Sequence, residues 1–167
     1  MTAIRERQYL KCPFNKAPSF LNDYIERLSR AIDPDGSIVH LEVPLAALGI
    51  PSGLNIGHDV VAHFGPPDDA FGVQRIAVTW EPEGGGPFPT FTGFISVEQD
   101  ERYNSSSLLL EGTYEPPFGV TGVAFDAAFG RRIASATAHE LLHALRRTIE
   151  GSWSSASAKT GSVANGG

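Results

Sequence analysis

The spacing of apolar residues divides the chain into an early helix, a run of strands and a late helix. Apolar side chains recur every three or four residues from about Pro18 to Ile32, which predicts a helix with one apolar face. From Ser37 to Glu115 the period changes to two, as in strands with one buried face. The period of two predicts strands over 37–45, 58–64, 73–81, 90–98 and 108–115. Before the early helix, residues 4–12 predict a first strand with a less regular alternation.

The C-terminal part predicts a long helix over 120–150. We expect a break or kink at Gly130, because glycine within a helix costs about 1 kcal/mol relative to alanine. On a helical wheel centred on Leu145, the buried stripe consists of Ala134, Ala138, Leu141, Leu142 and Ile149. The segment 151–167 is rich in Ser, Ala and Gly and predicts a flexible tail, so residues 1–150 form the expected single domain.

This order of elements predicts an α+β fold. Strands joined by short turns favour an antiparallel sheet, and a strongly bent sheet has a concave face that one long amphipathic helix can cover. Where the helix does not fill the concavity, a pocket remains between the two layers, as in many ligand sites.

Composition and charge narrow the function classes. The chain has 167 residues, of which 41% are hydrophobic, and its formal net charge is −6. This charge argues against binding to nucleic acid or to an anionic membrane surface, and no apolar run reaches the ~20 residues of a membrane span. Cys12 is the single cysteine and has no partner for an intramolecular disulfide. With no secretory pattern near the N-terminus, we expect a cytoplasmic location.

One short motif carries potential chemistry. His139-Glu140-Leu141-Leu142-His143 matches the HExxH pattern, in which two histidines bind zinc and the glutamate activates the metal-bound water. A catalytic zinc needs a third protein ligand, and no histidine follows His143. Glu150 lies about 10 Å further along a straight helix, which is too far to share the metal. The remaining candidates for the third zinc ligand are three histidines on predicted strands, His40, His58 and His63.

The wheel places His139 and His143 away from the buried stripe, on a polar face with Arg146 and Glu150. We therefore interpret the motif as a solvated helix surface with weak ion pairs, and expect no bound metal, no cofactor and no catalytic residue. A zinc site at His139, Glu140 and His143 stays as an alternative.

Aromatic residues offer a second candidate site. Most of them lie on predicted strands, where aromatic side chains usually form ordinary core. If they instead line a pocket, the candidates are Tyr24, Trp80, Phe91, Phe94, Tyr114 and Phe118.

Three stretches of the chain resemble bacterial members of the START-like superfamily, also called SRPBCC or Bet v 1-like proteins. They are Trp80-Glu81-Pro82, Phe88-Pro89-Thr90-Phe91-Thr92-Gly93 and Leu110 to Gly119, with Gly122 to Glu150 similar to the C-terminal helix of that superfamily. The resemblance covers most of residues 4–150. It implies a helix-grip fold, in which a curved sheet wraps around a long C-terminal helix and encloses a deep apolar cavity.

The resemblance also implies a function, but no catalytic residue, because members of the superfamily share none. We expect a small apolar ligand, such as a lipid, sterol or polyketide, between the sheet and the C-terminal helix. One alternative is a cyclase- or aromatase-like enzyme that uses Tyr114 or His40 for acid–base work; the other is the zinc hydrolase. The sequence leaves the ligand and the oligomeric state open.

Overall fold

The computed structural model of the chain describes residues 2–31, 37–44, 55–70, 73–83, 90–101, 105–115 and 123–163. A first strand, β1 (Thr2–Leu10), leads into helix α1 (Ala17–Ala31). Five strands come next: β2 (Ser37–Pro44), β3 (Asn55–Ala70), β4 (Val73–Pro82), β5 (Thr90–Gln99) and β6 (Ser106–Glu115). The long helix α2 (Val123–Val163) is the last element.

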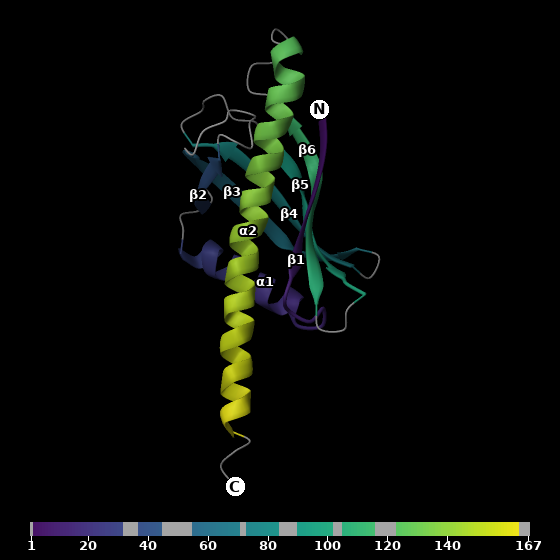
Figure 1. Cartoon of the computed structure of the whole chain (residues 1–167), viewed down its shortest axis with the longest axis vertical. Coiled ribbons are helices and arrows are strands. Elements are labelled where there is room, and N and C mark those ends of the chain that lie inside the picture. The colour runs from purple at the N-terminus through teal and green to yellow at the C-terminus, as the bar shows by residue number, and fades with distance from the viewer. Residues whose placement is uncertain are drawn as a thin grey trace.

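The strands form one antiparallel sheet in the order β1-β6-β5-β4-β3-β2. β1 and β2 are thus its two edges, and α2 packs against both of them as well as against β6. One helix can contact both edges only if the sheet curves around it, and Figure 1 shows α2 running along the length of the sheet with α1 near the lower end. The predicted α+β helix-grip fold is confirmed.

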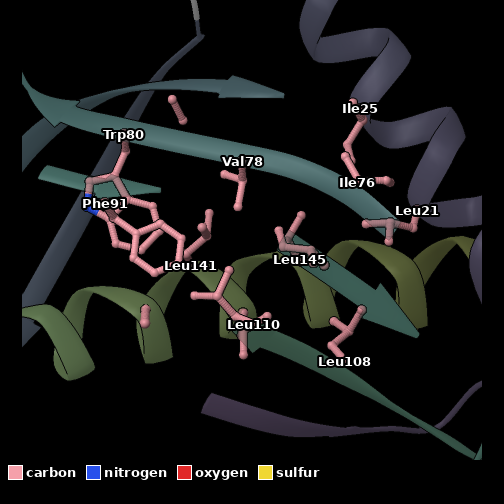
Figure 2. Packing of buried hydrophobic residues seen from close by; sticks show 14 of the residues in the cluster. Leu21, Ile25, Ile76, Val78, Trp80, Phe91, Leu108, Leu110, Leu141 and Leu145 are labelled. Atoms are coloured by element: carbon pink, nitrogen blue, oxygen red, sulfur yellow. The ribbon is translucent and has the colours of Figure 1, made fainter. Parts of the chain in front are cut away.

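The core lies between the inner face of the sheet and α2. On β4, the alternating residues Ile76, Val78 and Trp80 are buried, as the period of two predicts. The predicted stripe of α2 is buried as well, with Leu142 and Ile149 fully inaccessible to solvent. In Figure 2, Leu21 and Ile25 of α1 lie at the Ile76 end of this core, and Trp80 lies at the other end.

Strand β3 is longer than predicted. The sequence indicates a turn beginning at Gly65-Pro66-Pro67, but β3 continues through this segment to Ala70. The pairing with β4 shifts in register between Phe64 and Pro67, so a bulge takes up the segment that contains Pro66. Proline is tolerated at bulges because the ladder hydrogen bond is already interrupted there.

Helix α2 differs from its prediction in two ways. It continues through Gly130 without a break, and it extends to Val163, so the segment 151–163 is helical rather than a flexible tail. The ring of Trp153 packs edge-on against Phe20 of α1, with the ring centroids 6.3 Å apart. The hydroxyl of Ser154 donates to the carbonyl oxygen of Glu150 at 2.8 Å, which also fits a helical backbone. Residues 164–167 lie outside the described residues.

A pair of glycines lets one aromatic ring lie against the sheet. Gly93 of β5 and Gly112 of β6 are directly paired. A Cβ atom would lie 2.6 Å from Phe91 Cζ at Gly93, and 2.5 Å from it at Gly112. Side chains at these two positions would occupy the space of the Phe91 ring, so glycine is required there.

Candidate ligand-binding interior

Three of the predicted aromatic residues form a row across the sheet. Phe91 of β5 pairs directly with Trp80 of β4 on one side and with Tyr114 of β6 on the other. The rings of Trp80 and Phe91 are stacked, with centroids 4.0 Å apart and planes inclined by 13° (Figure 2). All three side chains are at most 2% exposed. Cross-strand pairing thus brings Trp80, Phe91 and Tyr114 to one place on the inner face.

The α2 residues that face the sheet change in size along the helix. Large side chains, including Leu142, Leu145 and Ile149, fill the stripe toward α1. In Figure 2, Leu141 points from α2 toward Phe91. Further toward the start of α2, the buried stripe carries the small residues Ala134 and Ala138, both fully inaccessible. Between the large buried side chains of Ile133 and Leu141, the described part of α2 therefore contributes short side chains to the core.

Thr137 is a buried polar residue in this part of the helix. Its side chain is 1% exposed, and within the described part of the chain its hydroxyl has no hydrogen-bond partner. An unpaired buried hydroxyl costs about 1–3 kcal/mol, so such a group needs an explanation. The sequence prediction missed Thr137, although it lies four residues before Leu141 and therefore on the same helical face.

Two other aromatic candidates, Phe94 and Tyr24, lie outside this row. Phe94 lies on the opposite face of β5 from Phe91 and is 48% exposed, so it does not line the interior. Successive side chains of a strand point to opposite faces, so Phe91 and Phe94 cannot both line the interior. The prediction that Phe94 lines the pocket is therefore wrong. Tyr24 lies on α1, half-buried against the core, where burial raises the pKa of its phenol despite the opposing effects of Arg27 and of a hydrogen bond with Thr148. Phe118 lies outside the described residues.

The histidine motif lies along the β1 edge of the sheet. His139 is exposed and His143 is half-buried, consistent with their predicted position away from the core stripe. The side-chain amide nitrogen of Gln8 lies 3.1 Å from Nδ1 and 3.2 Å from Nε2 of His139, so β1 contacts this ring directly. In the described part of the chain, no group of three or more His, Cys, Asp or Glu side chains is placed to hold a metal ion. These residues provide no third ligand; His40 lies in β2, but its side chain is outside the described part.

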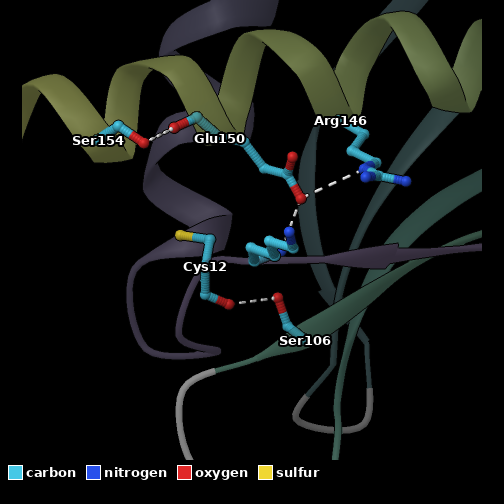
Figure 3. Close-up of polar contacts among 6 residues, drawn as sticks. Cys12, Ser106, Arg146, Glu150 and Ser154 are labelled. Atoms are coloured by element: carbon cyan, nitrogen blue, oxygen red, sulfur yellow. Dashed lines mark hydrogen bonds and ion pairs between the residues drawn. The ribbon is translucent and has the colours of Figure 1, made fainter.

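Further along the same helix face, Glu150 connects α2 to the end of β1 through a hydrogen bond. Its Oε1 accepts this bond from the backbone N–H of Lys11 at 2.8 Å. The same oxygen forms a salt bridge with Nε of Arg146 at 3.2 Å. The neighbouring Cys12 is buried, and its carbonyl oxygen accepts from the hydroxyl of Ser106 at 2.9 Å (Figure 3). Burial, and secondarily the negative charge of Glu150, raise the pKa of the Cys12 thiol to about 11.

The chemistry available in the interior is limited. The buried polar side chains of the described residues are neutral amides and hydroxyls, and none of them is a carboxylate, histidine or lysine. These residues can make dispersion contacts and hydrogen bonds, and the buried described residues include two weak acids, the Tyr114 phenol and the Cys12 thiol. A separate groove of about 400 Å³ between α1 and α2 is lined by Phe20, Asp23, Glu26, Arg27 and Ser152, a mostly charged set.

Comparisons with known proteins agree with the architecture. No protein-family model matches the chain. No curated protein matches it either. Among solved structures, a protein from Thermus thermophilus is similar over 90% of this chain and 99% of its own, with 13% identity and a TM-score of 0.52. At that identity the similarity shows the fold alone.

Two further solved structures have a similar extent of overlap. A START superfamily protein from Mycobacterium smegmatis aligns over 92% of this chain and 97% of its own, at 14% identity and a TM-score of 0.42. The protein Ara h 8.0201 aligns over 92% and 98%, at 12% identity and a TM-score of 0.48. The START-like fold implied by the sequence resemblance is the fold observed in the sheet order and the position of α2.

Within the described ranges, neither α1 nor α2 contains a stretch that is long and apolar enough to cross a bilayer.

Proposed function

We propose that this protein binds a small, mainly apolar molecule between the inner face of the sheet and α2, at the end marked by Trp80, Phe91 and Tyr114. The observation that carries the proposal is the mismatch of side-chain size at this end. Large aromatic rings project from the sheet, while the buried face of α2 between Ile133 and Leu141 carries the short side chains Ala134, Thr137 and Ala138. Apolar sites with a few polar groups are typical of small-molecule binding.

The neutral lining supports binding rather than catalysis. A cyclase-like or hydrolytic reaction needs a positioned acid or base or a set of metal ligands, and the buried described residues offer only the Tyr114 phenol and the Cys12 thiol as weak acids, with no group of metal ligands. We therefore place ligand binding ahead of the enzymatic alternatives. Aromatic rings and a small-residue helix face contribute shape and dispersion energy, which suit a flat or flexible hydrocarbon skeleton. A cytoplasmic location stays a prediction from the single buried Cys12.

Native mass spectrometry of the gently purified protein is the first test. We expect a mass above that of the polypeptide, lost on organic extraction, with an apolar molecule recovered in the extract. A protein that carries no such mass, and takes up none after incubation with an extract of cell lipids, would contradict the proposal.

A matched pair of variants tests the location. Ala138→Leu adds volume beside the aromatic row, and Ala158→Leu adds the same volume at an exposed position of the same helix. If the space near Ala138 takes a ligand, Ala138→Leu abolishes binding and the protein remains folded, whereas Ala158→Leu binds as before. If this region is ordinary close-packed core, Ala138→Leu costs about 1–3 kcal/mol of stability, as overpacking does.

A further inference from the structure

We propose that the hydroxyl of Thr137 is a polar anchor for the bound molecule, so that the ligand is a neutral apolar compound with one hydrogen-bonding group, such as an alcohol or a carbonyl. This inference rests on the proposed function, because it names the class of ligand for the same site. It is carried by a separate observation, the unpaired state of this one hydroxyl.

Other hydroxyls on α2 show what an ordinary helical hydroxyl does. Thr148 donates to the carbonyl oxygen of Ala144 at 3.1 Å, and Ser155 donates to that of Gly151 at 2.9 Å. Ser154 makes the same bond to Glu150. This bond to the residue four positions earlier is the usual way for a hydroxyl on a helix to be satisfied. Thr137 does not make it, although its side chain is more deeply buried than those of these three residues.

The position of Thr137 connects the hydroxyl to the proposed site. Thr137 lies one turn before Leu141, whose side chain points toward Phe91 in Figure 2. It also lies one residue before Ala138, which belongs to the same buried cluster as Trp80 and Phe91. A ligand that binds between the sheet and the short residues of α2, as proposed above, would therefore meet this hydroxyl.

The surroundings favour a neutral group over a charged one. Among the buried residues of the described chain there is no cationic side chain, so a carboxylate or phosphate placed here would lose its hydration without gaining a counter-charge. A hydroxyl both donates and accepts, so Thr137 can pair equally with an alcohol or with a carbonyl oxygen.

Two probes that differ only in a terminal hydroxyl test the inference: bromoundecanol and bromoundecane. Bromine quenches an indole that it contacts, and the chain has 2 tryptophans. In a Trp153→Phe background, all tryptophan emission comes from Trp80 in the aromatic row. Titrations are compared in this background and after adding Thr137→Val, which keeps the shape, or Thr137→Ser, which keeps the hydroxyl. Thermal unfolding confirms that each variant is folded.

We expect the background protein to bind bromoundecanol about five- to tenfold more tightly than bromoundecane. Thr137→Val should abolish this preference with little loss of bromoundecane binding, and Thr137→Ser should retain it. A preference that survives in Thr137→Val, or equal binding of both probes to the background protein, overturns the anchor while leaving the proposed function intact. Failure of both probes to quench Trp80 rejects the proposed function and, with it, the anchor.

Discussion

The indole of Trp80 stacks on the ring of Phe91, with the two ring centroids 4.0 Å apart. The contact joins neighbouring strands β4 and β5 at directly paired positions, and both residues are 2% exposed. Stacked aromatic pairs contribute about 0.5–1.5 kcal/mol beyond the area that they bury. This pair therefore helps to stabilise the pairing of β4 with β5 at the end where we place the ligand.

The glycine beneath Phe91 should tolerate no side chain. In Gly112→Ala, the new Cβ would meet Phe91 Cζ at 2.5 Å and Gly93 Cα at 2.6 Å, and the backbone of β5 cannot yield as a flexible side chain can. We expect a loss of about 2–3 kcal/mol in the free energy of unfolding, measured by denaturant titration. An unchanged unfolding midpoint would show that the Phe91 ring does not lie against this glycine.

Gly151 provides the opposite case on α2. A Cβ at this position would have no atom within 4 Å, and the residue is exposed in a helix. Gly151→Ala should raise the free energy of unfolding by about 0.5–1 kcal/mol, because alanine loses less conformational freedom in a helix. The same substitution should increase helical circular dichroism. No change in either quantity would favour the flexible tail that the composition predicts.

The Cys12 thiol should be slow to react and should couple folding to alkaline pH. Its pKa is raised from 9.0 to about 11 in the folded protein, so the folded state holds the proton more tightly than the unfolded state. Its contribution to stability is therefore complete below pH 9 and is lost as the pH rises through 11, by about 2–3 kcal/mol in total.

Comparison with Cys12→Ala isolates this effect from the titration of tyrosines and lysines. The difference in unfolding free energy between the parent and Cys12→Ala should shrink between pH 9 and 11. The native parent should also react slowly with dithionitrobenzoate at neutral pH and quickly once unfolded. Rapid modification of the native protein would show that the thiol is accessible or ionised.

Glu150 should contribute to stability through the end of β1. Glu150→Ala removes the acceptor for the backbone N–H of Lys11 and the partner of Arg146, and we expect a loss of about 1–2 kcal/mol. Glu150→Gln keeps an acceptor oxygen and should lose less. Equal losses in the two variants would show that charge, rather than the hydrogen bond to Lys11, determines the contribution.

Local periodicity predicted most of the fold. The alternation on β4 and the wheel of α2 identified the buried faces correctly, because both reflect which side chains avoid water. Errors arose where tertiary contacts override local preference. The composition of the segment after Glu150 predicts a flexible tail, but this segment is helical and its Trp153 packs against Phe20 of α1. In β3, a bulge lets the strand continue through Pro66, where the sequence indicates a turn.

The candidate site was predicted less completely. Trp80, Phe91 and Tyr114 were identified by residue type, but their direct pairing depends on strand register, which the sequence does not specify. Thr137 was missed because a threonine in a helix gives no sign of whether its hydroxyl is paired. Only the position of the surrounding carbonyls and side chains reveals that it is not.

The most direct test of ligand binding in the interior uses Trp80 itself as the reporter. Bromoundecane is titrated into Trp153→Phe, in which only Trp80 emits, and into Trp80→Phe, in which only Trp153 emits at its contact with Phe20. We predict saturable quenching of Trp80 with one probe bound per chain, and little quenching of Trp153. Unquenched Trp80 emission, or equal quenching of both tryptophans without saturation, would contradict an apolar binding site between the sheet and α2.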